Sequence, residues 1–529
     1  MSPSNASFLN QPMSRRALLG GTGVLAATSL LASCASPSPS PTPGGGGTGT
    51  PSTGGLFRIG YLGGSGADQI DPILASGSPD AMRLRQLYSN LALYGEDGAV
   101  APSLAESITQ EGVNTWVVRL RDGVTFHSGK TLDADDLIFS IQRILGPDSH
   151  NTGTLGMIDP NGLKKLDNLT VELTLSTPAY YLPESFTQVS ASIVPVDFDP
   201  ANPVGTGPFK LKSFTPGEKV EFVRFDDYWG DVAKVDELSI QTFKDEAARV
   251  AALQGGQIDH APLLAASFTG VVQGASNLTL HNYASGRFEN VVLQTTSPEF
   301  KNPEVRRAMR MLVNRQQIVD QVYGGFASIG NDIPEPSSVY YNKDLPQWEH
   351  DIDEAMSILK SAGAADMQLE FVAADLTPTT VNMAQAVTQQ FVEAGIDTKM
   401  KQIEASAYYS PDSGFGTPDR ALSLDIWGGW SFATFTNLSQ LPGADFNESS
   451  WENQDFLSAY KAASNTVDEA ERKKHLADAQ EIMHSESGTI IPAFIDVLDV
   501  YGSNVQGYKT DPLGLGGGDF NYTGISFTS

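Results

Sequence analysis

The sequence of 529 residues contains a single cysteine, Cys34. One thiol excludes an internal disulfide framework and any zinc cluster built from several cysteines. Histidine is scarce as well, and its seven copies never lie three or four residues apart, so no helix presents a His pair to a metal ion. A metal site would have to be assembled from residues distant in the sequence. We therefore expect no metal and no cofactor.

Positively charged residues are also scarce in this chain. The chain has 34 Lys and Arg residues against 62 Asp and Glu residues, a formal net charge of −28. Such a balance repels phosphate backbones and anionic lipids, so we expect no nucleic-acid partner and no basic membrane-binding patch. No repeat with a period of roughly 20–50 residues is present, which argues against a solenoid. At about 100–200 residues per domain, the length predicts about three packed units.

Motifs for reaction chemistry are also missing. The Gly-x-Ser-x-Gly sequence that exposes a nucleophilic serine does not occur. The glycine-rich runs at 44–47 and 514–518 lack the Lys-Ser/Thr pair of a phosphate-binding loop. We expect no catalytic residues and no enzymatic activity. A hydrolase that uses paired carboxylates stays open as an alternative, because acids are plentiful throughout the chain.

No apolar run is long enough to form a spanning helix. The stretch 17–32 is interrupted by glycines and falls short of the roughly 20 residues that a bilayer requires. Arg15 and Arg16 precede it and Leu31-Ala32-Ser33-Cys34 ends it, a pattern that resembles a twin-arginine export signal with a lipoprotein cleavage site. The resemblance implies cleavage before Cys34 and lipidation of its thiol.

This layout divides the amino-terminal part of the chain into two segments. We interpret residues 1–33 as a signal peptide. Residues 34–55 are rich in Ser, Pro, Gly and Thr and cannot bury apolar surface, so we interpret them as the lipidated Cys followed by a disordered tether. The sequence thus predicts an extracytoplasmic protein that is anchored to the outer face of the cell membrane only through Cys34.

From residue 56 onward, short β-rich runs alternate with amphipathic stretches. The alternation predicts strands at 57–62, 115–120, 170–175 and 209–214. Apolar residues at helical spacing predict helices after Asp133, Asn302 and Asp351 and at 377–394 and 468–483. Strands and helices interleave without the regular alternation of a barrel. We therefore expect a mixed α/β fold with more than one lobe.

Several ordered blocks of sequence resemble one known family. The longest runs from Leu120 to Ser140 and includes Arg121-Asp122-Gly123 and Phe126-His127-Ser128-Gly129-Lys130. Further blocks follow in the same order, at 205–209, 227–229, 253–259, 303–308 and 505–508. Together they resemble the solute-binding proteins of ABC importers that take up oligopeptides, dipeptides or nickel, known as solute-binding protein family 5.

The resemblance implies an α/β, two-lobed fold like that of periplasmic binding proteins, with an extra subdomain in the first lobe and two hinge crossings. Mapped by motif order, lobe I comprises residues 56–290 with the inserted subdomain at about 95–200. Lobe II comprises residues 291–497, and residues 498–529 return to lobe I. The crossings are expected near 288–294 and 493–503.

The resemblance also places a cleft-lining segment at Asp425 to Phe435. Trp427 matches a Trp of the family's cleft, whereas Trp430 stands where peptide-binding members usually carry an Asp that pairs with the ligand's amino terminus. The missing charge favours a ligand held by aromatic stacking, or an amine held elsewhere. We predict Trp427, Trp430 and Phe432 as ligand contacts. The alternative is that the aromatic residues of this segment form a core cluster.

Four further residues are secondary candidates for ligand binding: Tyr61 in the first strand, Asp71 in the loop after it, Tyr88 in the following helix, and Arg287 beside the first crossing. In contrast, we expect His127, the turn at 205–208 and Arg306 to have structural roles, because buried and turn-forming residues usually do.

The sequence therefore predicts a receptor that closes two lobes around a solute and delivers it to ABC permease subunits in the membrane. An oligopeptide is the first choice of ligand, with glycosides, opine-like compounds and metal chelates behind it. We expect a monomer. Two rival functions stay open, a secreted hydrolase and a solute sensor that serves a signalling system.

Overall fold

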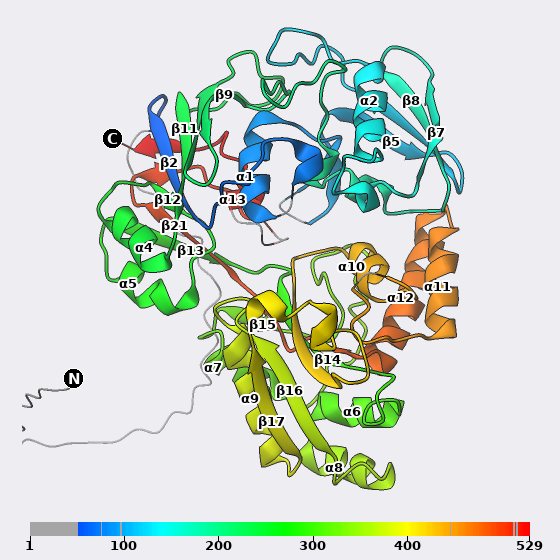
Figure 1. Ribbon diagram of the computed structural model, residues 1–529. Helices are drawn as coiled ribbons and strands as arrows, with labels where there is room; N and C mark the ends of the chain where they lie inside the picture. Colours follow the sequence, from blue (N-terminus) through cyan, green and yellow to red (C-terminus); the bar gives the residue numbers. More distant parts are fainter. Residues whose placement is uncertain are drawn as a thin grey trace, which may run out of the picture. The chain divides into compact units, whose positions relative to one another are not determined.

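The computed structural model describes residues 51–75, 77–95, 98–444, 446–511, 514 and 517–528. The predicted signal peptide, Cys34 and nearly all of the predicted tether lie outside the described residues. Within them the chain is mixed α/β and contains two seven-stranded sheets (Figure 1). We call the part built on the first sheet lobe I and the part built on the second sheet lobe II.

The sheet of lobe I mixes parallel and antiparallel strands. Its strands, in spatial order, are β13 (Leu278–Tyr283), β21 (Val497–Gly502), β12 (His260–Ala261), β2 (Leu56–Leu62), β11 (Glu237–Phe243), β10 (Lys219–Arg224) and β9 (Phe209–Thr215). The central strand β2 runs parallel to both of its neighbours. Three helices pack against this sheet: α1 (Ser78–Leu87), α4 (Glu246–Gln254) and α5 (Thr269–Gln273).

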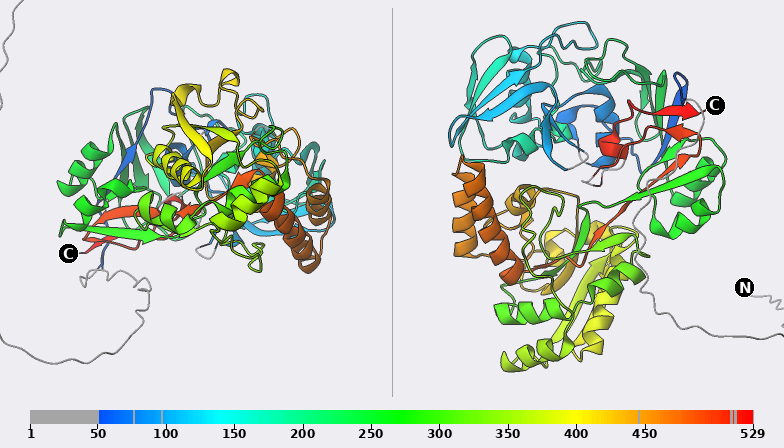
Figure 2. Two further views of the ribbon diagram at one scale, coloured as in Figure 1. Left: turned by 90° about the horizontal axis from the view of Figure 1, so that it is seen from below. Right: turned by 180° about the vertical axis from the view of Figure 1, so that it is seen from behind.

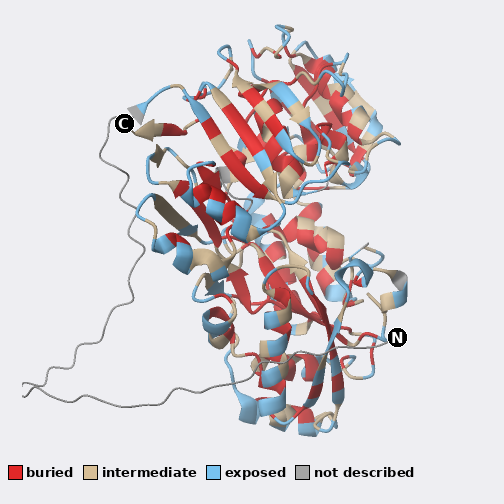
Figure 3. Ribbon diagram, turned by 60° about the vertical axis from the view of Figure 1, so that its left-hand side comes forward, coloured by how far each residue is buried: buried red, intermediate tan, exposed pale blue. Residues whose placement is uncertain are grey.

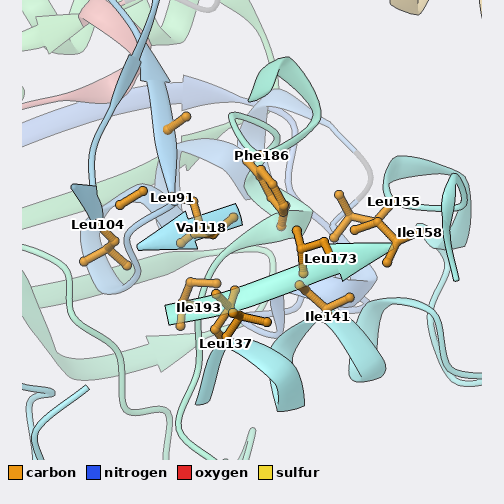
Figure 4. Close-up of a cluster of buried hydrophobic side chains, with 14 of the residues drawn as sticks. Leu91, Leu104, Val118, Leu137, Ile141, Leu155, Ile158, Leu173, Phe186 and Ile193 are labelled. Atoms are coloured by element: carbon orange, nitrogen blue, oxygen red, sulfur yellow. The ribbon is translucent and has the colours of Figure 1, made fainter. Parts of the chain in front are cut away.

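A separate core forms the extra subdomain of lobe I. A four-stranded antiparallel sheet combines β5 (Ala105–Gln110), β6 (Thr115–Leu120), β8 (Thr170–Leu175) and β7 (Ile158–Lys165). Helix α2 (Ala134–Ile144) contributes Leu137 and Ile141 to the apolar cluster, which Val118 and Leu173 join from the strands (Figure 4). The hairpin of β3 (Ala92–Tyr94) and β4 (Val100–Pro102) and the short helix α3 (Leu182–Ser185) connect the subdomain to the rest of the lobe.

The sheet of lobe II has β14 (Phe288–Leu293) near its centre, and all six residues of this strand are buried. The spatial order is β15 (Ala327–Ile329), β20 (Ala493–Ile495), β14, β18 (Leu422–Trp427), β16 (Gln368–Ala374) and β17 (Asp397–Ile403), with β19 (Thr489–Ile490) also paired to β14. Figure 3 shows buried residues concentrated in the strands of both lobes, while the helices expose their outer faces.

Seven α-helices complete the described part of lobe II. They are α6 (Pro303–Met311), α7 (Arg315–Gln321), α8 (Ile352–Ser361), α9 (Thr380–Glu393), α10 (Phe432–Ser439), α11 (Gln454–Ser464) and α12 (Glu469–Glu486). Local sequence explains where several begin. Asn302 and Asp351 each accept a hydrogen bond from a backbone N–H of the first turn and so cap α6 and α8. The predicted helix starts at these residues are confirmed.

The chain passes between the two sheets twice. It leaves the first sheet after β13 and enters the second at β14, then returns between β20 and β21. The two crossings lie side by side, because the Ile495 N–H donates a hydrogen bond of 2.7 Å to the Arg287 carbonyl. The first sheet change thus falls between Tyr283 and Phe288, a few residues before the predicted crossing at 288–294.

Both ends of the described chain meet in a small sheet. Strand β23 (Ser526–Thr528) pairs with β1 (Pro51–Ser52) on one side and with β22 (Val505–Gln506) on the other. The short helix α13 (Gly517–Phe520) precedes β23 and lies beside α1, as Figure 2 shows from behind. Among the described residues, no helix combines the length and hydropathy needed to cross a bilayer.

Candidate functional site

The predicted cleft segment begins at the end of β18 and continues into α10. Trp427 is the last residue of the strand and pairs with Phe288, the first residue of β14 after the crossing. Ser431 caps α10 by accepting a hydrogen bond from the Thr434 N–H. The segment therefore lies at the edge of the lobe II sheet next to the crossing, where the two lobes join (Figure 1).

Trp427 is half-buried and rests on the core of lobe II. Its ring meets Phe435 edge to face, with centroids 4.8 Å apart, and Trp430 at 6.3 Å. Asp425, two residues earlier, is buried and accepts a hydrogen bond of 2.6 Å from the Tyr409 hydroxyl. Trp427 thus has both a supporting role in the core and a surface on which a ligand can stack.

Trp430 is the most open aromatic side chain of the segment, with 40% of its surface exposed. The indole lies against Gly428, where a Cβ atom would fall 2.2 Å from the indole nitrogen. Glycine at position 428 therefore allows the ring to fold back over the backbone. An exposed indole beside Trp427 fits the predicted ligand contact.

Phe432 is different, because its side chain is only 3% exposed and belongs to an apolar cluster with Phe435, Tyr460 and Phe288. The core alternative describes this ring correctly, so we no longer propose its side chain as a ligand contact. Its backbone is more informative, since the Phe432 N–H donates a hydrogen bond of 2.9 Å to Glu335.

Lobe I reaches the same cluster. Tyr180, which precedes α3, is buried in it and contacts Tyr340 edge to face, with ring centroids 5.7 Å apart. In the first turn of α12, Arg472 donates a hydrogen bond of 2.7 Å to Gln110 of the subdomain and lies 5.4 Å from the Tyr180 ring. The lobes are therefore in contact beside the predicted cleft segment.

Two glutamates from different lobes meet at this contact. The Ser431 side chain of lobe II partly offsets the effect of burial on Glu184 of α3, and Glu335 of lobe II accepts a hydrogen bond from the neighbouring Phe432 N–H. Burial raises the pKa of Glu184 to about 7. Burial and the charge of Glu184 raise the pKa of Glu335 to about 8. Burial thus disfavours the charged form of both carboxyl groups, and the charge of Glu184 adds to this effect at Glu335.

A cavity of about 160 Å³ lies in lobe I. Arg85, Gln86, Tyr94 and Asp519 are among its lining residues. Tyr94 connects the cavity with the acids: burial raises the pKa of its hydroxyl well above the ordinary value, and the charges of Glu184 and Glu335 raise it further. Tyr94 of the cavity wall therefore experiences the charges of both carboxyl groups.

Two secondary candidates have structural roles instead. Asp71 is buried, caps a short 3₁₀ helix at 72–74 and forms a two-point ion pair with Arg143, one bond of which measures 2.8 Å. Tyr88 is 2% exposed, follows the last residue of α1, and donates its hydroxyl proton to the Ile70 carbonyl at 2.9 Å. Both side chains are engaged in bonds within lobe I, and Tyr88 also lines the cavity of that lobe.

The other two secondary candidates come together near the crossing. Tyr61 is nearly buried at the end of β2 and forms a hydrogen bond with Ser78, while burial raises the pKa of its hydroxyl. The positive charge of Arg287 acts on this hydroxyl and on Glu289 of lobe II. The charge of Arg287 therefore acts on groups of both lobes, from the segment that passes between the two sheets.

The motif residues that we expected to be structural do serve the fold. His127 is held by the turn at 205–208, since its ring accepts from the Gly205 N–H at 3.3 Å and meets the Gly207 carbonyl at 3.0 Å. Burial lowers the pKa of His127 to about 4. Arg306 donates to the Phe300 and Glu486 carbonyls. These contacts explain the residues without a ligand.

Glu184, Glu335 and Tyr94 were not predicted from sequence. No spacing rule relates them, because each belongs to a different segment and Glu335 comes from the other lobe than Glu184 and Tyr94. The one local signal is the sequence Pro334-Glu335-Pro336, in which an acid stands between two prolines and adopts a φ of 61°. Within the described ranges, no group of three His, Cys, Asp or Glu side chains could hold a metal ion.

Comparisons with known proteins agree with this architecture. The model of the bacterial extracellular solute-binding proteins, family 5 (middle), matches residues 99–448. The glutathione-binding protein GsiB of Salmonella paratyphi A is 25% identical over 477 residues, which cover 85% of this chain and 91% of that protein. The dipeptide-binding protein of Escherichia coli K12 is 25% identical over 463 residues, 78% of this chain and 84% of that protein.

A solved structure supports the same assignment of the fold. The ABC transporter substrate-binding protein CtaP of Listeria monocytogenes superposes with a TM-score of 0.80 at 23% identity, covering 90% of this chain and all of that one. Proteins of the matched family bind solutes for transport, so the chain is a binding protein and the hydrolase alternative is wrong. Because the family model matches well over half of its length, the chain belongs to the bacterial extracellular solute-binding proteins of family 5.

Proposed function

We propose that this protein is a lipid-anchored extracytoplasmic receptor that captures an oligopeptide or a similar organic solute between its lobes and delivers it to an ABC importer. The observation that carries the proposal is the position of the segment from Trp427 to Ser431. It belongs to lobe II, yet it meets Glu184 of lobe I and exposes the indole of Trp430. A solute bound here would touch both lobes and so favour their closure.

The proposed ligand class rests on the relatives, whose names specify glutathione and dipeptides. Trp430 and Trp427 supply apolar surface for a side chain or a chain of methylene groups, and Tyr61 and Arg287 supply polar groups near the crossing. We propose these four residues as ligand contacts and keep glycosides, opine-like compounds and metal chelates as further candidates. Permease subunits in the membrane are the proposed protein partners of a monomeric receptor.

The proposed division of the chain follows the sheets. We propose lobe I at 56–290 with its subdomain at about 95–200, lobe II at 291–497, and a return to lobe I at 498–529. The exchange of strands between the two sheets on either side of the crossings supports these limits to within a few residues.

Native mass spectrometry of the purified protein tests the receptor function. Protein isolated from cells grown in peptide-rich medium should carry a small molecule that is released on denaturation, and fragmentation should identify it. Deletion of the gene should then abolish uptake of that compound. Uptake that continues unchanged in the deletion strain would rule out the importer role.

The lipid anchor has its own test. We expect Cys34→Ser to shift the exported protein from the membrane fraction to the medium or periplasm, and Arg15→Lys with Arg16→Lys to keep the precursor inside the cell. A Cys34→Ser protein that stays in the membrane fraction would contradict the anchor without affecting ligand binding.

A further inference from the structure

Lobe II contains two buried acids that no described residue pairs with a positive charge. Asp425 of β18 is 3% exposed, and Glu448, between α10 and α11, is 4% exposed. Among the described residues, no ion pair includes either carboxylate. The buried Arg420 guanidinium instead lies over the Tyr408 ring, 3.8 Å from its centroid, and donates to the Tyr408 carbonyl at 3.0 Å. Burying a carboxylate without a cation is costly, so a bound cation would stabilise both acids.

The two acids are neighbours of the same amide. Asn290 of β14 stands directly opposite Asp425 in the antiparallel register. Their side chains therefore lie on one face of the sheet, with Cβ atoms roughly 4.5–5.5 Å apart. The Asn290 Nδ2 donates a hydrogen bond of 2.9 Å to Oε1 of Glu448. Asn290, which is fully buried, thus joins the two acids into one cluster.

Two oxygen atoms of this cluster lack a partner. Oε2 of Glu448 and Oδ1 of Asn290 are both inaccessible to solvent and form no hydrogen bond. The Asn290 amide cannot satisfy its oxygen by turning over, because that oxygen would then face the Glu448 carboxylate. A proton shared between the acids would leave the amide oxygen without a partner, whereas a metal ion binds oxygens of all three side chains at once.

Hydrogen bonds on both sides hold these oxygens in place. The Gln294 Nε2 donates to the Glu448 carbonyl at 2.9 Å and so fixes the segment of Glu448 to the end of β14. Oδ1 of Asp425 accepts from the Tyr409 hydroxyl at 2.6 Å and from the Ile426 N–H at 2.8 Å. Because the ligands are already ordered, binding of an ion would cost little conformational entropy.

We propose that Asp425, Glu448 and the side-chain oxygen of Asn290 bind a hard metal cation, Ca²⁺, in the interior of lobe II. Carboxylate and amide oxygens are the ligands of Ca²⁺, and two carboxylates balance its charge. Mg²⁺ fits less well, because it demands near-ideal octahedral geometry and gives up its water reluctantly. Within the described ranges no three His, Cys, Asp or Glu side chains could hold a metal, so the amide oxygen is the third side-chain ligand here.

The proposed ion lies next to Trp427. This residue follows Asp425 by two positions on β18, so the two side chains share a face of the sheet. The Trp427 ring also meets Phe446, two residues before Glu448, with centroids 6.3 Å apart. Ca²⁺ would therefore connect the strand and the segment on either side of Trp427. The site belongs to lobe II alone and goes beyond the proposed receptor function, since it requires no solute.

Titration with metal ions tests the site in the full chain carrying Cys34→Ser, which cannot be lipidated. The protein is stripped with a chelator and then titrated with Ca²⁺, Mg²⁺ or Na⁺ at constant ionic strength. We expect one Ca²⁺ per chain by mass spectrometry of the metal content, and a melting temperature that rises with Ca²⁺ concentration only. Terbium, a luminescent substitute for Ca²⁺, should emit on excitation of tryptophan and be displaced by Ca²⁺.

Two outcomes would overturn the proposal. One is a stripped protein that takes up no Ca²⁺ and melts at the same temperature with and without it. The other is an equal rise of the melting temperature with all three salts, which would reflect screening of surface charge rather than a site. Neither measurement needs a variant, so the test holds even if a substitution in the cluster prevents folding.

Variants locate the ion. Asp425→Asn and Glu448→Gln keep the side-chain shapes and should each weaken Ca²⁺ binding at least tenfold. Glu289→Gln is the matched control, because Glu289 is a buried acid on the opposite face of β14 whose carboxylate accepts from the hydroxyls of Tyr323, Thr377 and Thr379. Glu393→Gln, at an exposed glutamate of α9, is the surface control. Both controls should keep the parent affinity, and unchanged affinity in Asp425→Asn and Glu448→Gln would overturn the assignment.

Discussion

Trp427 and Trp430 stand three residues apart but contribute differently. The ring of Trp427 packs against Phe435 and the core of lobe II, whereas the indole of Trp430 is 40% exposed and rests on its own backbone. Substitution of Trp427 should therefore lower both stability and ligand affinity. Substitution of Trp430 should lower ligand affinity and leave stability nearly unchanged.

We predict that Trp430→Ala weakens ligand binding by about 1–3 kcal/mol through the loss of aromatic contact. The melting temperature of the ligand-free protein should hardly change, because exposed substitutions usually alter stability by no more than about 0.5 kcal/mol. Calorimetry with the co-purified ligand and a thermal melt measure the two effects. Trp427→Ala is the matched comparison and should lower stability by about 2–4 kcal/mol. Full affinity in Trp430→Ala would remove this residue from the site.

Glu335 makes the stability of the ligand-free protein depend on pH. Its pKa is raised from 4.5 to about 8 in the folded chain, so the folded state binds more protons than the unfolded state between these values. Stability from this group is therefore present at low pH and is lost as the pH rises through that window. The contribution of Glu335 to the free energy of unfolding of the wild-type protein should therefore decrease as the pH rises from 5 to 8.

We predict that Glu335→Gln removes this loss. The free energy of unfolding of the variant relative to the wild type should increase by about 1 kcal/mol for each pH unit in the middle of the window. Urea denaturation at several pH values measures the difference, and Glu393→Gln serves as the control. Parallel pH profiles for Glu335→Gln and wild type would show that the carboxyl group titrates normally.

At the scale of elements, helix α2 shows how local sequence determines a boundary. Asp133 accepts hydrogen bonds from the N–H groups of Asp135 and Asp136, and the Asp136 side chain accepts from the Asp133 N–H in return. This reciprocal cap satisfies donors that the helix cannot satisfy itself. It occurs inside the longest motif of the family and fixes α2 against the subdomain sheet.

We predict that Asp133→Ala lowers the free energy of unfolding by about 1 kcal/mol, the usual cost of losing an N-cap. Asp135→Ala, which removes an exposed carboxylate from the same turn, should cost less than half as much. Chemical denaturation monitored by circular dichroism compares the two variants. Equal losses would mean that the cap contributes no more than the surface charge.

Helices and strands were predictable from the sequence where the pattern that determines them lies within the segment itself. Strands β6 and β8 coincide with the predicted ranges 115–120 and 170–175, because alternation of apolar residues is a property of the segment itself. The bonds that hold Asp71 and Tyr88 within lobe I were not predictable, because their partners, Arg143 and the Ile70 carbonyl, cannot be inferred from neighbouring residues. Glu184 and Glu335 escaped prediction for the same reason, since only the packing of two lobes joins them.

At the scale of the whole molecule, the contact between Gln110 and Arg472 connects the subdomain of lobe I with α12 of lobe II. Arg472 keeps further bonds to the Thr466 and Val467 carbonyls within its own lobe, so it stays ordered without Gln110. Substitution of Gln110 should therefore weaken the contact between lobes without disturbing lobe II, whereas substitution of Arg472 would also remove bonds within lobe II.

We predict that Gln110→Ala shifts the ligand-free protein toward separated lobes by about tenfold, since a hydrogen bond to a charged donor contributes about 1.5 kcal/mol or more. Small-angle X-ray scattering should show a larger radius of gyration for the ligand-free variant than for the wild type, and saturating ligand should abolish the difference. Ser107→Ala in the same strand, β5, is the control. Identical scattering without ligand would mean that this bond does not hold the lobes.

The pairing of β1 with β23 has a mechanical consequence. The first described residues are hydrogen-bonded to the last strand of the chain, and both belong with lobe I. A membrane attachment through the amino terminus would therefore reach the folded body at lobe I, and lobe II would be the part that moves relative to the attached lobe. A pair of fluorophores, one on the outer helices of lobe II and one fused to the carboxyl terminus on lobe I, should then report each ligand-driven closure on intact cells as a change in energy transfer between them.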